Sequence, residues 1–201
     1  MAEIKLTKNE LRTQQLKLVQ LQKYLPTLQL KKAMLQIEVD NAKNEIQALQ
    51  LEYDKSYSAL EGMAPLFTEK LPFDLAHHIQ VKSVQKEYEN IAGVEVPLFL
   101  EIDFEEGYYS LFETPAWVDS VVEQMRQVYR SFARVEIARQ KKLALEKELR
   151  EVSIRVNLFE KVLIPRASQN IKKIKVFLGD QELAAVSRSK VAKTKILSRQ
   201  R

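Results

Sequence analysis

The sequence predicts a mainly α-helical protein: a long antiparallel two-helix coiled coil with a short central β-hairpin insert. Two observations support this. Apolar residues recur at three- and four-residue intervals on both sides of the insert, as in coiled-coil helices. Three of the four glycines and four of the six prolines lie between Glu61 and Val118. We therefore expect an N-terminal arm (residues 1–60), a central insert (61–118) and a C-terminal arm (119–201).

The first helix is expected to begin at Thr7, because Thr7-Lys8-Asn9-Glu10 is a capping box. One heptad count then fits the whole arm, and twelve of its fifteen core positions are apolar. Pro26 removes one backbone hydrogen bond from this helix, so we expect a bend or a local break there, after which the helix resumes. The core positions are Leu11, Gln14, Leu18, Leu21, Leu25, Leu28, Lys32, Leu35, Val39, Ala42, Ile46, Leu49, Tyr53, Ser56 and Leu60.

The insert carries a hairpin signal. Apolar residues alternate from Val94 to Phe104, which is the period of a half-buried strand. A weaker strand is predicted around Ile79 to Val84, with a turn at Ala92-Gly93. An isolated hairpin is marginally stable, so it should rest on the coiled coil or on another protein. Four aromatic residues could pack on such a partner or equally on the hairpin's own arms: Tyr108, Tyr109, Phe112 and Trp117.

The C-terminal arm reads as one helix from Ser120 to Leu178, about 90 Å long at the α-helical rise, which must lie antiparallel to the first arm to bury its apolar side. A capping box at Ser120 or an earlier start at Thr114-Pro115 would begin it. Gly179-Asp180 is expected to end it. The predicted seam comprises Met125, Val128, Phe132, Val135, Ala138, Leu145, Leu149, Val152, Val156, Phe159, Leu163, Ala167, Ile171, Ile174 and Leu178.

Charge is distributed unevenly. The net charge of +5 is the sum of +2 over residues 1–60, −8 over 61–118 and +11 over 119–201. Residues 183–201 carry six basic side chains and no acidic one. This basic end is open to three interpretations: a solvated end favoured by the helix dipole, a phosphate-binding surface, or a segment that docks in a cavity of another protein. No aromatic residue is interleaved there to stack on bases.

Catalytic and metal chemistry find little support. The chain has no cysteine, and its four glycines form no phosphate-binding loop. The two histidines, His77 and His78, are adjacent and would point to opposite faces of a strand, so a shared metal is not expected. We expect no cofactor and no enzymatic activity. Since no signal sequence and no long apolar run is apparent, we expect a cytoplasmic protein without direct membrane insertion.

Two motifs resemble a known family. The opening LTKNEL (Leu6 to Leu11) and RVNLFEKVLIPR (Arg155 to Arg166), followed by Ile171-Lys172-Lys173-Ile174, resemble the D subunit of the V-type and A-type rotary ATPases, in a bacterial form. The resemblance covers both arms. It implies a non-catalytic central-stalk rotor subunit that couples ATP hydrolysis or synthesis to ion translocation. A non-catalytic coiled-coil scaffold and a nucleic-acid-binding coiled coil remain the alternatives.

The resemblance also implies that the protein is peripheral to the membrane as part of the ATPase complex, and that its partners are other proteins and not nucleic acid. They are the hexamer of catalytic and non-catalytic ATPase subunits, the small stalk subunit (the F subunit) and the subunit that caps the rotor ring. Residues implied to enter the hexamer cavity are Thr7, Lys8, Arg12, Arg166, Lys172, Lys173, Arg188 and Lys190. Residues implied to contact the small stalk subunit are Val96, Leu98, Leu100, Tyr108 and Phe112.

Overall fold

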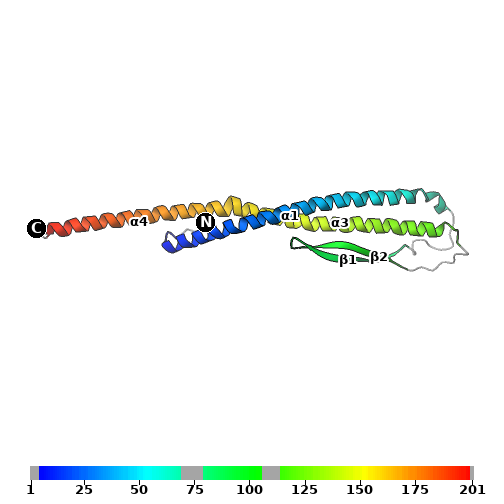
Figure 1. The fold of residues 1–201 in the computed structure, drawn as a ribbon, viewed down its shortest axis with the longest axis horizontal. Coiled ribbons are helices and arrows are strands. Elements are labelled where there is room, and N and C mark those ends of the chain that lie inside the picture. The colour runs from blue at the N-terminus through cyan, green and yellow to red at the C-terminus, as the bar shows by residue number, and fades with distance from the viewer. Residues whose placement is uncertain (1–4, 69–78, 106–113, 200–201) are drawn as a thin grey trace. The chain divides into compact units, whose positions relative to one another are not determined.

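In a computed structural model, the chain divides into two compact units, and residues 5–68, 79–105 and 114–199 are described. Unit 1 comprises Met1–Lys31 and Val152–Arg201, and unit 2 comprises Lys32–Glu151. The elements follow in the order shown in Figure 1. They are helix α1 (Lys8–Glu61), a 3₁₀ turn η1 (Ala64–Thr68), strands β1 (Val81–Ile91) and β2 (Val94–Phe104), helix α3 (Val118–Leu158), a π-helical turn η2 (Phe159–Leu163) and helix α4 (Ile164–Arg199).

Helix α1 begins as its sequence predicts. The Glu10 backbone N–H donates to the Thr7 hydroxyl at 3.3 Å, which is half of the predicted capping box. A local break at Pro26 was a wrong expectation, because α1 is continuous from Lys8 to Glu61. One proline removes only one of the helix's backbone hydrogen bonds, and the long packed helix on both sides keeps the turn helical.

The heptad prediction for both arms is confirmed by burial. All fifteen core positions of α1 are buried or half-buried, and Leu35, Val39 and Ala42 are almost fully so. On the C-terminal arm the same holds along the seam, with Leu145 and Ile174 fully buried. Phe132 is the exception, being about half exposed. The hydrophobic core of each unit therefore lies along the line that the apolar periodicity marks.

Polar contacts show that the helices of each unit run antiparallel. In unit 2, the Lys141 ammonium lies 3.0 Å from a Glu45 carboxylate oxygen. Nearer the start of α3, the Gln124 amide donates to the Ser56 carbonyl at 3.2 Å. Residues earlier in α3 therefore contact residues later in α1, as in an antiparallel pair. In unit 1, the Lys8 ammonium lies 3.6 Å from a Glu182 oxygen, which pairs the start of α1 with a late part of α4. The predicted mainly α fold with a hairpin insert is confirmed.

The hairpin has the predicted two-residue turn. Ile91 pairs with Val94, and Ala92 and Gly93 between them have φ angles of 51° and 82°. Both angles are left-handed, as a type I′ turn requires, so an alanine occupies a conformation that glycine adopts more easily. The Gly93 N–H donates to the Asn90 side-chain oxygen at 2.9 Å, which holds the turn closed. Strand β1 reaches Ile91 and is longer than predicted.

Three features of the C-terminal arm differ from prediction. Helix α3 begins at Val118, so neither Ser120 nor Thr114-Pro115 marks its start. The Val118 N–H donates to the Pro115 carbonyl at 3.1 Å, which closes the turn that leads in. Gly179-Asp180 does not end a helix, because α4 continues to Arg199. A single glycine costs only about 1 kcal/mol in a helix interior, and strong helix formers follow it. The π-helical turn was not predicted.

Candidate partner-binding surfaces

The predicted hexamer-binding residues all lie on unit 1, and all of them are exposed. The Thr7 hydroxyl is engaged in the α1 cap, and Lys8 forms the ion pair with Glu182, whose side chains are 77% and 69% exposed. The Arg188 Nε donates to the Ala184 carbonyl of its own helix at 3.3 Å. The basic side chains therefore remain at the surface, available to a partner. The set is Thr7, Lys8, Arg12, Arg166, Lys172, Lys173, Arg188 and Lys190.

Helix α1 carries a second apolar stripe within unit 1. Leu16, Val19 and Leu30 are about 60% exposed, and Leu16 and Leu30 lie two positions beyond Gln14 and Leu28 of the core line. Two residues correspond to a rotation of about 200° in an α-helix, so these side chains lie on the side opposite the core. A helix that is apolar on two opposite sides is typical of burial on both.

The C-terminal part of unit 1, which comprises the end of α3, η2 and α4, repeats this arrangement. The buried residues Val152, Val156 and Ile174 are each followed, two positions later, by an exposed aliphatic residue. The outward residues of this part are Ile154, Leu158, Val162 and Val176. We call these four, together with Leu16, Val19 and Leu30, the outer stripes. Exposed aliphatic residues that recur on one side of a helix are typical of an interaction site.

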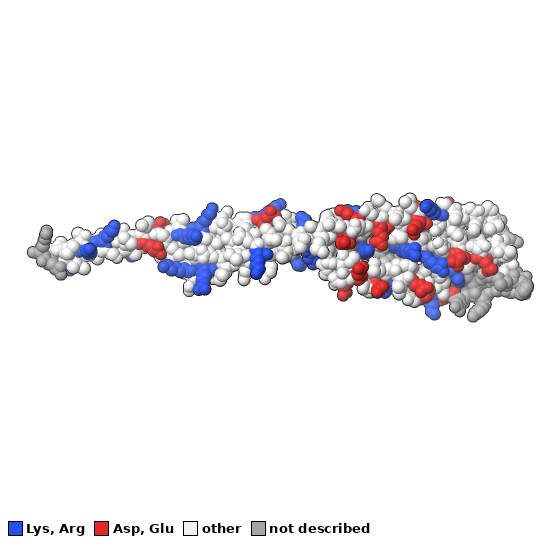
Figure 2. Space-filling model, in the orientation of Figure 1, with Lys and Arg blue, Asp and Glu red and all other residues white. Residues whose placement is uncertain are grey.

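The last part of α4 extends beyond the start of α1. Lys8 lies beside Glu182, and α4 continues for seventeen more residues to Arg199. Every residue from Gln181 to Arg199 is exposed. Figure 2 shows basic side chains spaced along this helix with uncharged surface between them. The exposed aliphatic residues of this end are Leu183, Val186, Val191, Ile196 and Leu197.

In unit 2, the hairpin lies along α3 (Figure 1). Arginine side chains of α3 stack on aromatic rings of β2. The guanidinium carbons of Arg126 and Arg130 lie 5.3 Å and 5.5 Å from the centre of the Phe104 ring. Arg134 lies 5.6 Å from the centre of the Phe99 ring. Each such contact at a partly exposed site contributes about 0.5–1 kcal/mol. The four-residue spacing of these arginines places them on one side of α3, facing β2.

The predicted contacts for the small stalk subunit divide by burial. Val96 is 0% exposed and belongs to the core of unit 2, so a partner could touch it only if this core opened. Leu98 is half-buried and Leu100 is 59% exposed. Leu100 is thus the described residue of this set that offers the most surface. Tyr108 and Phe112 lie outside the described residues, as do His77 and His78.

A polar cluster joins the two strands near their open end. The Ser83 hydroxyl donates to an Asp103 carboxylate oxygen at 2.7 Å, and the Gln85 amide donates to the same oxygen at 2.9 Å. These two hydrogen bonds lower the pKa of Asp103 below its ordinary value because they stabilise the charged form, and the bond from Ser83 has the larger effect. The group is fully solvated, so this cluster aligns the strands rather than forming a reactive site.

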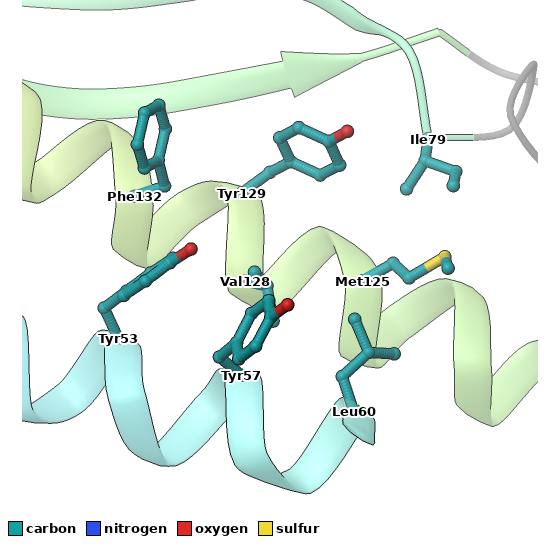
Figure 3. Close-up of a pocket in the computed structure, with 8 residues that line it drawn as sticks. All are labelled: Tyr53, Tyr57, Leu60, Ile79, Met125, Val128, Tyr129 and Phe132. Atoms are coloured by element: carbon teal, nitrogen blue, oxygen red, sulfur yellow. The ribbon is translucent and has the colours of Figure 1, made fainter. Parts of the chain in front are cut away.

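An aromatic cavity of about 360 Å³ lies between the end of α1 and the start of α3. Figure 3 shows Tyr53 and Tyr57 on one side of it and Tyr129 and Phe132 on the other. The Tyr53 ring lies 6.0 Å from the Phe132 ring, centre to centre. Ile79, ahead of β1, lies across the opening (Figure 3). The remaining lining residues are Leu60, Met125 and Val128.

Sequence reasoning missed this cavity, although a signal was present. Tyr53 and Tyr57 are one helical turn apart, and so are Tyr129 and Phe132. Aromatic residues at such spacing at the insert ends of both arms could have been read as facing walls. A second hollow of about 350 Å³ lies between β1 and α3 and shares Tyr129 and Phe132 with the first. Tyr129 and Phe132 therefore face two hollows that the side chains of unit 2 do not fill.

Over the described parts of the chain, no cluster of three or more histidine or acidic side chains could hold a metal ion. Within the same ranges, none of the helices is both long enough and apolar enough to cross a bilayer. What the described residues do offer is exposed apolar and basic surface, which suits the binding of other macromolecules.

Comparison with known proteins identifies the family. A family model described as the D subunit of ATP synthase matches residues 10–194. The chain belongs to the ATP synthase D subunit family. The V-type ATP synthase D subunit of Chlamydia felis is 46% identical over 199 residues, which cover 98% of this chain and 96% of that protein. That of Borreliella burgdorferi is 43% identical over 201 residues, 100% of this chain and 98% of the relative. The match extends over both units of this D subunit family member.

Proposed function

We propose that this chain is the central-stalk rotor subunit of a bacterial V-type rotary ATPase or ATP synthase. It would couple ATP hydrolysis or synthesis in a hexamer of catalytic and non-catalytic subunits to ion movement through a membrane ring. In this assignment the chain is cytoplasmic, peripheral to the membrane and non-catalytic. Membership of the D subunit family, and the V-type ATP synthases to which its relatives belong, support the assignment.

The observation that carries the proposal is the pair of outer stripes of unit 1. An antiparallel helix pair that already buries one apolar line has no internal use for a second line on each helix. Their exposure suits a partner that surrounds the pair, such as the wall of a central cavity. A partner on one side only would leave one stripe in water.

The basic residues within the outer stripes suit a rotating contact. Arg12 on α1 and Arg166 and Lys172 on α4 are exposed, and each lies one helical turn from a stripe residue, so charges interrupt both apolar stripes. Charged contacts that stay near solvent affect the orientation of the partners and the rate of encounter more than the strength of binding. Interchangeable contacts are needed if one asymmetric shaft meets three equivalent positions of a hexamer in turn.

Unit 2 would carry the remaining partners. The hairpin surface around Leu98 and Leu100 is proposed to bind the small stalk subunit, and Val96 would support that surface from within the core. The end of the unit that includes η1 and the start of α3 is proposed to sit on the subunit that caps the rotor ring. Replacement of Leu100 by Asp should weaken binding of the small stalk subunit and leave hexamer binding unchanged.

A single-molecule rotation assay tests the proposal directly. The chain has no cysteine, so Tyr88→Cys on the hairpin, at a side chain that is 67% exposed, provides one attachment point for a bead. The chain is mixed with the hexamer of its own ATPase, immobilised on a surface, and supplied with ATP. We expect one chain per hexamer by native mass spectrometry and unidirectional rotation of the bead.

The alternatives predict different results. A coiled-coil scaffold would bind the complex while the bead stays still during ATP hydrolysis, which would contradict the rotor assignment. A nucleic-acid-binding coiled coil would bind DNA or RNA with steep salt dependence and would not associate with the hexamer. A matched control is the same bead attached to the immobilised hexamer itself, which should not rotate.

A further inference from the structure

Two defects in backbone hydrogen bonding occur in unit 1, one on each helical strand. In α1, Pro26 has no N–H, so the carbonyl four residues before it loses its helical donor. On the other strand, Phe159–Leu163 form a π-helical turn, in which the Ile164 N–H donates to the Phe159 carbonyl five residues back. Pro165 follows at once and again lacks an N–H. Both places therefore lack the regular ladder that stiffens an α-helix.

The two defects lie at the same level of the antiparallel pair. Lys8 lies beside Glu182, and antiparallel α-helices advance by equal steps in opposite directions. Pro26 is eighteen residues after Lys8, and eighteen residues before Glu182 is Ile164. Pro26 thus lies within about one helical turn of the level of the boundary between the π-helical turn and Pro165. A defect in one helix alone would be held straight by the regular helix beside it, but here each helix lacks backbone hydrogen bonds at this level.

Side-chain packing is also thinner at this level. No residue of the π-helical turn is fully buried. On α1, Leu25 and Leu28 on either side of Pro26 are half-buried. Fully buried residues resume within about five residues of the defects, at Leu21, Val156 and Ala167. The level of Pro26 therefore combines missing backbone hydrogen bonds with a π-helical turn that has no fully buried residue, and both features lower the resistance to bending.

We propose that Pro26, the Phe159–Leu163 turn and Pro165 form one bending joint in unit 1. The part of the helix pair that contains the start of α1 and the end of α4 would change direction at this joint, while the seams on both sides keep their register. The bending depends only on the structure of this helix pair, not on the proposed function. Its use rests on the proposed function: a joint here would let the hexamer-bound end of a rotor adapt to three successive contact positions.

The joint is tested on the full chain in solution by distances between paired spin labels. The chain has no cysteine, so labels can be placed at will. Asn157 and Asp180, both exposed, span the joint and are twenty-three residues apart, about 35 Å along a straight helix. Gln127 and Arg150 are exposed on α3, have the same separation and serve as the matched control. We expect the distance distribution across the joint to be at least about twice as wide as the control. Equal widths would overturn the proposal.

A second measurement assigns the effect to the prolines. The double variant Pro26→Ala, Pro165→Ala restores two backbone donors, and its distribution across the joint should narrow toward the control. Backbone amides near the joint should also exchange at least about tenfold more slowly than in the unsubstituted chain. An unchanged width in the folded double variant would show that the prolines create no joint. Both experiments use the free chain, so a failed joint leaves the rotation assay intact, and failed rotation leaves the joint intact.

Discussion

Substitutions at two nearby positions of α4 distinguish the role of the intramolecular seam from the role of the outer stripes. Ile174 is 0% exposed and Val176 is 65% exposed, although only one residue lies between them. Ile174→Asp removes a fully buried aliphatic side chain, which costs about 1.5–3 kcal/mol, and adds a buried carboxylate with no partner, which costs more. Because domains are stable by only about 5–15 kcal/mol, the helix pair of unit 1 should separate at a lower temperature than in the unsubstituted chain.

Val176→Asp should act only on binding. In the free chain it changes a solvent-exposed residue, so the free energy of unfolding should shift by no more than about 0.5 kcal/mol. If the hexamer covers this position, burying the exposed two-thirds of a valine contributes about 1 kcal/mol. Its loss should weaken hexamer binding about fivefold, and the cost of desolvating the new carboxylate adds to that.

Two assays decide the outcome. Thermal melts followed by helical circular dichroism report the stability of the free chain, and titration of labelled chain with hexamer reports the dissociation constant. Equal destabilisation of the free chain by both variants would mean that the assigned buried side of α4 is wrong. Unchanged hexamer affinity for the folded Val176→Asp variant would show that this outer stripe lies outside the interface. Ile174→Val, which keeps the seam apolar, is the matched control for stability.

Three further predictions address other parts of the chain. Arg134→Ala should remove the stacking on Phe99, about 0.5–1 kcal/mol, together with an exposed ion pair to Glu52 on α1 that contributes little. Hydrogen exchange in β2 should therefore quicken while the helical melt changes little. The pKa of Asp103 is lowered in the folded hairpin, so its stabilisation is present above the unfolded value and lost as pH falls through the folded one. Hairpin amide protection should therefore decline on acidification in the unsubstituted chain but not in Asp103→Asn, and parallel declines would refute this. Deletion of residues 183–201 should weaken hexamer binding but not binding of the small stalk subunit, whereas full retention of ATP-driven rotation would show this end to be only solvated.

The regular parts of this fold could be predicted because they depend on a repeating pattern. Each heptad position of α1 from Leu11 to Leu60 became buried or half-buried, since one apolar line on each helix is sufficient to pair them. The two-residue turn followed equally from Ala92-Gly93 between alternating strands. Local signals decided these elements, and nothing distant competed with them.

Single-residue signals were less reliable, because tertiary packing overrides them. Gly179 looked like a helix end, but the cost of one glycine is small beside the propensity of the helix formers that follow it. The π-helical turn before Pro165 has no sequence pattern of its own beyond the proline. Val96 looked like part of a surface because alternation shows which residues share a face, not which face is covered.

The outer stripes and the aromatic cavity were missed for a related reason. Periodicity was used to find one partner for each helix, and one partner already accounts for one apolar line. Leu16 and Leu30 repeat with the same heptad interval as the core residues, two positions away. A helix with two such lines is expected to have two partners, and under the proposed function the second is the hexamer.

The exposed end of α4 has a thermodynamic consequence of its own. Residues 183–199 form a helix of seventeen residues with every side chain exposed, close to the length at which isolated helices are only marginally formed in water. In the free chain this end should fray on warming, well before the paired seams separate. When a partner encloses this end, the contacts must offset the conformational entropy that the chain loses on ordering. Part of the contact free energy is therefore consumed in folding. Enclosure should therefore be accompanied by a heat-capacity decrease larger than rigid docking would give, and the end of the helix would be a segment that folds on binding.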